Sequence, residues 1–86
     1  MLLHVGSQVA IMTKEIVAIL NYKAVIGSPA TKEFIEVARA EKRLTDVSDG
    51  QRESILVLDN EVIISPIATS TLRKRVTADV SAHGRI

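Results

Sequence analysis

Among the side chains with the chemistry to contact an anion, six in three places along the chain stand out: Lys14, Gln51, Arg52, Arg73, Lys74 and Arg75. Guanidinium groups form paired hydrogen bonds to phosphate oxygens, and lysine supplies a compact positive charge. Arg52 lies in a polar stretch after Gly50, where a glycine-hinged loop can bring it to a phosphate. Residues 73–75 carry adjacent positive charges that fan out around a helix axis. These positions indicate a surface that binds phosphate groups.

Each basic group also has a plain structural interpretation, and the residues by themselves leave both interpretations open. Cations in the last turn of a helix interact favourably with the helix dipole, and an arginine on a loop is often simply solvated. The formal net charge of the chain is +1 at pH 7, so it is not a polycation. An anion-binding surface would therefore depend on local clustering of charge.

Residues suited to catalysis or metal binding are scarce. The chain has no cysteine and two histidines, of which His4 lies in an expected short strand and His83 in an expected loose tail. Such positions favour neither a zinc site nor a general base held in a reacting geometry. Asp49 and Asp59 adjoin turn-forming residues, and turn chemistry accounts for both. We therefore expect no enzyme activity, no cofactor and no small-molecule substrate.

Length and composition predict a single domain that associates with copies of itself. The chain has 86 residues, 47% of them hydrophobic, and its mean hydropathy is +0.22. A domain this short has too much surface for its volume to bury so many aliphatic side chains in one core. The longest apolar run, Ile16–Leu20, is far shorter than the roughly 20 residues of a membrane-spanning helix. Because there is also no signal-peptide pattern and no cysteine, we expect a cytoplasmic homo-oligomer.

The hydrophobic pattern predicts short strands before and after one central helix. Gly6-Ser7 is expected to form a two-residue turn between the first two strands. Ser28 and Pro29 predict the start of an amphipathic helix whose apolar side, Phe34 included, packs on the sheet. The predicted strands are Leu2–Val5, Gln8–Met12, Ile16–Leu20, Leu44–Ser48, Ile55–Leu58 and Val62–Ile64.

These elements indicate an α+β domain with a small, mostly antiparallel sheet, one main central helix and a short C-terminal helix. The last helix begins at Thr69 or Ser70 and ends near Val76, so the domain spans residues 1–76 and residues 77–86 form a flexible tail. One main helix covers only one face of a sheet, yet Ile16–Leu20 is apolar at every position and should be covered on both faces. We expect the second face, or an exposed strand edge, to meet another copy.

Assembly would multiply weak contacts. In a closed ring each arginine is repeated once per subunit, and many modest phosphate contacts add up to strong, salt-sensitive binding. Tyr22 and Phe34 are the only aromatic residues, which disfavours stacking of single-stranded bases or RNA. Double-stranded DNA held through its backbone is then the favoured nucleic acid.

The order and spacing of several segments resemble a known family. These segments are Leu3–Gly6, Thr13–Leu20, Glu33–Arg39, Ile63–Ile67 and Ser70–Leu72. Together they resemble the extracellular matrix regulatory protein family (RemA/RemB-like), and above all its RemB branch, from about residue 2 to residue 75. The resemblance implies a LytTR-like fold and a ring-shaped homo-oligomer. It also implies transcription regulation of biofilm matrix genes, because the RemA branch is a DNA-binding activator whose ring is thought to carry DNA on arginines.

The resemblance carries over part of that DNA surface. The activator branch has two adjacent arginines after a glycine in the mid-chain loop, where this sequence has Gly50, Gln51 and Arg52. It also has an arginine before its Ile-Ile-Ala-Ile strand, where this sequence has Glu15, preceded by Lys14. An acid at a phosphate contact repels DNA. Two functions therefore stay open: a DNA-binding regulator, and a structural or interaction protein that binds a protein partner on the same ring scaffold.

Overall fold

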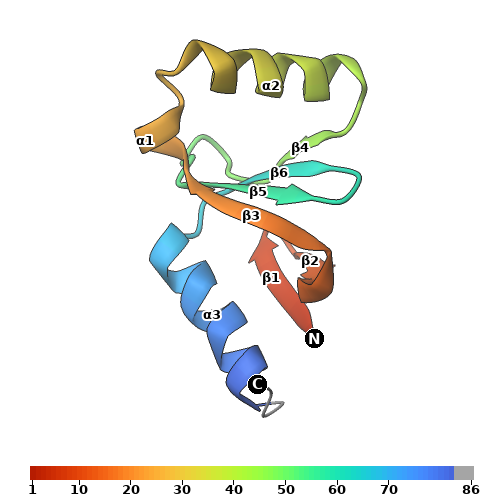
Figure 1. Cartoon of the computed structure of the whole chain (residues 1–86), viewed down its shortest axis with the longest axis vertical. Helices are drawn as coiled ribbons and strands as arrows, with labels where there is room; N and C mark the ends of the chain where they lie inside the picture. The colour runs from red at the N-terminus through yellow and green to blue at the C-terminus, as the bar shows by residue number, and fades with distance from the viewer. Residues whose placement is uncertain (83–86) are drawn as a thin grey trace.

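The computed structural model describes residues 1–82, and Figure 1 shows their course from red at the N-terminus to blue. His83, which the sequence places in a loose tail, lies outside the described residues. The elements in chain order are β1 (Leu2–Gly6), β2 (Val9–Met12), the 3-10 helix η1 (Thr13–Glu15), β3 (Ile16–Asn21), α1 (Tyr22–Val25), α2 (Pro29–Ala40), β4 (Leu44–Asp46), β5 (Ser54–Leu58), β6 (Val62–Ser65) and α3 (Thr69–Ala82). The predicted α+β class is confirmed.

The main sheet has four strands in the order β3-β5-β6-β4, and β1 and β2 form a separate two-stranded hairpin. Strand β5 pairs antiparallel with β3 and with β6, whereas β4 pairs parallel with β6. The pairing is therefore mostly antiparallel, as predicted. The β5–β6 hairpin occupies the middle of the sheet, and β3 and β4 are its two edges.

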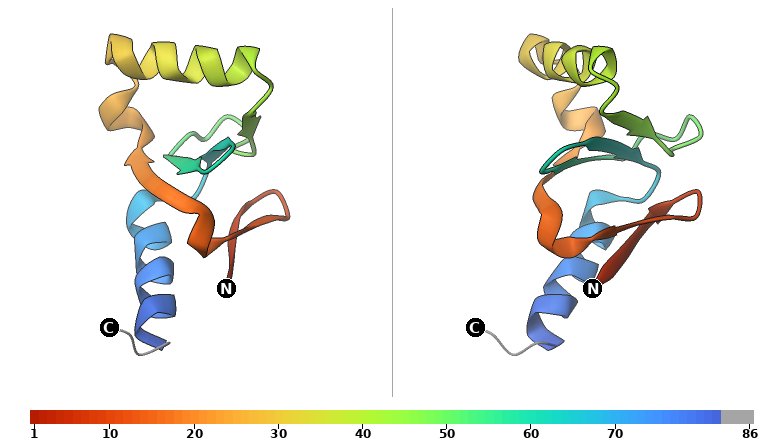
Figure 2. Two further views of the ribbon diagram at one scale, coloured as in Figure 1. Left: turned by 45° about the vertical axis from the view of Figure 1, so that its right-hand side comes forward. Right: turned by 90° about the vertical axis from the view of Figure 1, so that its right-hand side faces the viewer.

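Both faces of the main sheet are covered within a single chain. Ile55 of β5 packs against Ile35 of α2 on one face. Successive side chains of a strand point to opposite faces, so Leu56 joins a different cluster that includes Leu3 of β1 and Leu72 of α3. Figures 1 and 2 show the resulting layers, with α2 on one side of the sheet and the β1–β2 hairpin and α3 on the other.

This arrangement corrects the expectation that a neighbouring copy must cover the second face of the sheet. The sequence predicts one small sheet, but the first two strands pack across the other four as a layer of their own. The burial predicted for both faces of Ile16–Leu20 is wrong for the single chain, because Val17 is 66% exposed. Among the described residues, the large apolar side chains that stay exposed are Met1 and Leu2 at the start of the chain, Val17 in β3, and Phe34 and Val37 in α2.

Two completely buried serines fasten the layers to one another. The Ser65 hydroxyl donates to the carbonyl oxygen of Val5 at 2.7 Å and accepts from the backbone N–H of Ile67 at 3.0 Å. The Ser54 hydroxyl donates to the carbonyl oxygen of Ile67 at 2.6 Å and lies 2.9 Å from the Thr69 hydroxyl. A buried hydroxyl without a partner is costly, so these bonds fix β1 and the start of α3 relative to the sheet.

The two long helices differ from their predictions in phase and in length. Phe34, which the sequence assigns to the core, is 39% exposed, because the buried side of α2 is centred on Ile35 and Ala38. Helix α3 continues to Ala82, beyond Val76, where the sequence predicts its end. None of the helices in the described part of the chain is long and apolar enough to cross a membrane.

Gly6 allows the β1–β2 hairpin to approach the sheet. The turn residues are Ser7 and Gln8, with φ values of 50° and 65°, rather than the predicted Gly6-Ser7. Gly6 precedes the turn at a register shift and has a φ of 125°. A β-carbon there would lie 2.8 Å from Cδ of Pro66 and 3.3 Å from Cγ2 of Val47. Glycine alone satisfies both this backbone angle and this close approach.

We expect Gly6→Ala to lower the free energy of unfolding by about 2–3 kcal/mol, because a side chain at positive φ is strained and also collides with Pro66. Urea unfolding followed by circular dichroism measures the change. Gly27→Ala is the matched control, since a β-carbon at Gly27 meets nothing within 4 Å, and it should stay within about 0.5 kcal/mol of the wild type. Equal stability of the two variants would contradict this account of Gly6.

Candidate functional site

Arg52 and Asp46 form an ion pair across the loop that joins β4 to β5. Nε of Arg52 lies 3.1 Å from Oδ2 of Asp46, and 49% and 31% of the two side chains are exposed. The other carboxylate oxygen, Oδ1, accepts from the backbone N–H of Ser48 at 2.9 Å and from its hydroxyl at 2.5 Å. Ser48 is buried, so one carboxylate oxygen is bonded to a residue in the interior. The other oxygen is bonded to the guanidinium of Arg52, whose side chain is half exposed.

The same contacts set the ionisation of both partners. Burial by itself raises the pKa of Asp46, but hydrogen bonds from Ser48 and the charge and hydrogen bond of Arg52 outweigh it, so the pKa of Asp46 lies below its ordinary value. Asp46, and to a smaller extent the phenol of Tyr22, raise the pKa of Arg52. Both partners are therefore charged at neutral pH.

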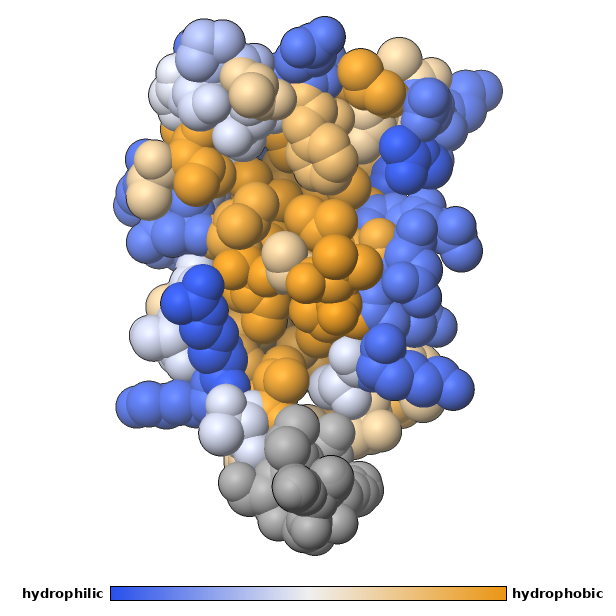
Figure 3. All heavy atoms as spheres, in the orientation of Figure 1, coloured by the Kyte–Doolittle hydropathy of each residue, from blue (hydrophilic) through white to orange (hydrophobic). Residues whose placement is uncertain are grey.

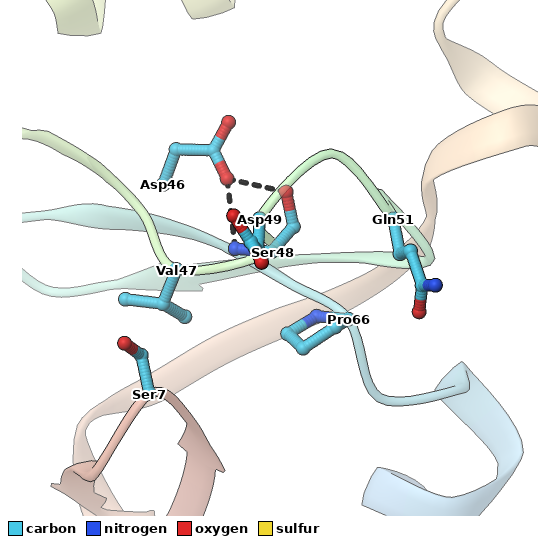
Figure 4. A pocket seen from close by; sticks show the side chains of 7 residues that line it. All are labelled: Ser7, Asp46, Val47, Ser48, Asp49, Gln51 and Pro66. Carbon is cyan, nitrogen blue, oxygen red and sulfur yellow. Dashed lines mark hydrogen bonds between the residues drawn. The ribbon is translucent and has the colours of Figure 1, made fainter.

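The loop after β4 borders an open cleft of about 630 Å³ whose lining is polar. The cleft lies between this loop, the β1–β2 turn and the chain after β6, and Figure 4 shows its lining residues, Ser7, Asp46, Val47, Ser48, Asp49, Gln51 and Pro66. The backbone N–H of Gln51 donates to the carbonyl oxygen of Ser48 at 3.0 Å. Among the described residues, no group of three or more histidine, cysteine or acidic side chains is placed to hold a metal ion.

A single chain does not bring the six predicted anion contacts together. Gln51 and Arg52 lie at the end of the sheet where β5 begins. Lys14 lies in η1, at the opposite end, where Ile16 of β3 pairs with Leu58 of β5. The two places are separated by the length of β5, so one phosphate cannot contact both.

Two of the three basic residues of α3 bind backbone carbonyl groups. Nη2 of Arg73 donates to the carbonyl oxygen of Ile19 in β3 at 3.0 Å, and Nη1 of Arg75 donates to that of His4 in β1 at 3.4 Å. Lys74 lies between them and is exposed. The sequence predicts all three as phosphate contacts. The structure adds a second role for two of them, because Arg73 attaches α3 to the sheet edge and Arg75 attaches it to the hairpin.

We expect Arg73→Ala to lower the free energy of unfolding by about 1 kcal/mol, because it removes a charge-assisted hydrogen bond between α3 and β3. Lys74→Ala, a truncation of the exposed neighbour, should stay within about 0.5 kcal/mol of the wild type. Urea unfolding of both variants tests the difference. If Arg73→Ala is as stable as Lys74→Ala, the bond to Ile19 does not hold the helix.

The region around β3 carries an exposed apolar face. Figure 3, drawn in the orientation of Figure 1, shows apolar side chains gathered over the middle of this side of the molecule and polar ones along its flanks. A groove of about 310 Å³ runs between α2 and strands β3 and β5, and it is lined by Leu20, Ala30, Thr31, Phe34, Ile55 and Val57. We call this groove, together with the exposed Val17 of β3, the β3–α2 face.

Main-chain groups of β3 also point outward. The backbone N–H of Tyr22 donates to the carbonyl oxygen of Glu53 at 3.0 Å, and hydrogen-bonded pairs alternate along an antiparallel ladder. Leu20 therefore bonds to β5, while the N–H and C=O groups of Ile19 point away from it. The bond from Arg73 to the carbonyl oxygen of Ile19 agrees with this direction. Strand β3 thus presents an open edge beside the apolar groove.

Asp46 and Phe34 are the parts of these surfaces that sequence reasoning missed. The partner of Asp46, Arg52, is six positions away across a loop, and nothing in the sequence pairs the two. The Asp-x-Ser spacing of Asp46 and Ser48 is typical of turns closed by an aspartate side chain, and it is the signal that could have identified this residue. Phe34 falls at helical spacing with Ala38, and the sequence therefore assigns it to the core.

The structure defines a small α+β domain with a polar cleft, a basic loop residue and an exposed apolar face. The family model described as RemA-like, extracellular matrix regulatory protein A-like, matches residues 2–76. The chain belongs to this family, so the resemblance found in the sequence is confirmed.

Two relatives agree with this assignment. Extracellular matrix regulatory protein B of Bacillus subtilis is 32% identical over 75 residues, which cover 87% of this chain and 89% of the relative. A regulatory protein of Desulfotalea psychrophila is 34% identical over 79 residues, which cover 90% of this chain and 67% of the relative. Both relatives are named for regulation and not for an enzyme activity.

Proposed function

We propose that this chain is a self-assembling regulatory protein that holds double-stranded DNA through backbone phosphates. One observation carries the proposal: the chain that leaves the β3–α2 face uncovered also presents the exposed guanidinium of Arg52 at a different place, the end of the sheet. Assembly through the first surface leaves the second accessible. The family and the names of the relatives support the regulatory part of the proposal.

The β3–α2 face supports self-assembly. An open strand edge flanked by exposed apolar side chains favours pairing with another chain, and proteins usually cover or block such an edge. Val17 is 66% and Phe34 39% exposed, and burying them in an interface removes apolar surface from water. A second copy of this chain is the partner we propose, in line with the ring assembly that the family resemblance implies.

Assembly also supports DNA binding, for a physical reason. The predicted basic contacts of one copy lie in separate places, and Arg52 is on a loop with about half of its side chain exposed. Copies set side by side would repeat each of these contacts along one DNA duplex. The contacts then add up, and each neutralised phosphate releases counterions, so affinity depends steeply on salt.

We expect Val17→Asp to shift the protein towards the monomer, because a carboxylate at an apolar interface loses its hydration without a partner. Light scattering at micromolar protein concentration measures the mass. Gln8→Asp adds the same charge to the exposed β1–β2 turn and should leave the mass unchanged. A wild-type chain that is monomeric under these conditions would refute the proposed assembly.

We expect Arg52→Gln to weaken binding to promoter duplexes about tenfold and to lower the dependence of affinity on salt, since one phosphate contact per subunit is lost. Its mass by light scattering should equal that of the wild type. Mobility-shift titrations at several salt concentrations test this prediction. The proposal fails if the wild type does not retard DNA even at low salt.

A second candidate function is an interaction protein that binds a protein partner instead of DNA. The observation in its favour is the acidity around the basic residues: Asp46 is paired with Arg52, Glu53 with Lys23, and Glu15 is exposed beside Lys14. Copurification of a stoichiometric protein partner without nucleic acid would favour this function over DNA binding.

A further inference from the structure

We infer that Asp46 positions the guanidinium of Arg52 for a phosphate of double-stranded DNA, although Asp46 is itself an acid at an anion-binding surface. The inference rests on the proposed function and adds a second residue to it. Its basis is a single carboxylate with three hydrogen bonds, two from Ser48 to Oδ1 and one from Arg52 to Oδ2.

The direction of the Arg52 bond decides which part of the guanidinium is left for a ligand. Asp46 accepts from Nε, and the phenol of Tyr22 is the second group that interacts with this guanidinium. A guanidinium has five N–H donors, four of them on Nη1 and Nη2. With half of the side chain exposed, the terminal nitrogens can donate to phosphate oxygens while Nε stays bound to Asp46.

Fixing the guanidinium before DNA arrives favours binding. A free arginine side chain samples many rotamers and loses that freedom when it contacts a ligand. Here the anchor is rigid, because Ser48 is 1% exposed and bonds the carboxylate through both its backbone N–H and its hydroxyl. Part of the ordering of Arg52 is therefore present in the free protein.

Charge by itself predicts the opposite role for Asp46. A carboxylate near a phosphate repels it, so its neutralisation should strengthen DNA binding. Asp49 provides the matched comparison, because it lines the same cleft while Arg52 is paired with Asp46. Asparagine tolerates the φ of 54° found at Asp49. Asp46→Asn and Asp49→Asn thus make the same change of charge in the same cleft.

The test is a set of fluorescence-anisotropy titrations of a promoter duplex with the full chain at several salt concentrations. Asp46→Asn should weaken binding at least about threefold at each salt concentration, because the guanidinium is no longer pre-ordered. Asp49→Asn should bind as the wild type does or up to about twofold more tightly. Ser48→Ala removes one bond to the carboxylate without changing charge and should weaken binding by about twofold. Thermal melting followed by circular dichroism checks that each variant is folded.

The Arg52→Gln background separates a positioning role from a general structural one. If Asp46 acts through Arg52, Asp46→Asn causes no further loss of affinity when Arg52 is already glutamine. A loss of similar size in both backgrounds would show that Asp46 merely supports the loop, and would overturn the inference. So would an Asp46→Asn variant that binds as tightly as the wild type. A wild-type chain that binds no duplex at low salt overturns the proposed function, and this inference with it.

Discussion

The hydroxyl of Ser65 joins parts of the molecule on which the other surfaces depend. It donates to β1 through the carbonyl oxygen of Val5, and it accepts from the N–H of Ile67 just before α3. The hairpin and α3 are the elements that cover one face of the sheet. With the hairpin bonded there, the close contact between Gly6 and Pro66 follows, and Ser7 and Pro66 become walls of the polar cleft. The packing of the layers therefore shapes the cleft that Asp46, the partner of Arg52, lines.

Side chains and loops add hydrogen bonds to the main sheet beyond its strand pairs. The backbone N–H groups of Val47 and Glu53, at the two ends of the loop after β4, donate to the carbonyl groups of Ile64 and Ser65 in the central strand β6. At edge strand β3, Arg73 binds one of the outward carbonyl groups, that of Ile19. Charged side chains at a strand edge are a common means of limiting unspecific pairing. Arg73 thus limits strand pairing at the β3 edge, whereas the neighbouring apolar groove favours contact with another chain there.

Much of the architecture follows from local pattern. Alternating or continuous apolar runs predict the strands, and Ser28-Pro29 predicts the start of α2, which begins at Pro29. The number of layers could not be predicted, because the pattern does not say whether Leu3 and Val5 extend the sheet or pack across it. The exposure of Phe34 depends on a small rotation of α2, which the spacing of its apolar residues does not fix. Arg73 and Arg75 look like free cations in the sequence because the carbonyl groups that they bind lie 54 and 71 positions away.

The bond between Ser65 and Val5 also constrains the order in which the chain can fold. Its two residues are 60 positions apart, so this bond between the hairpin and the sheet cannot form until β6 has been made. Contacts of such large sequence separation form slowly, because a long loop must close before they yield any stabilisation. During synthesis Leu3 and Val5, both buried in the finished fold, stay accessible to water and to other chains. Nascent copies that are close together could therefore meet before their own hairpins have docked.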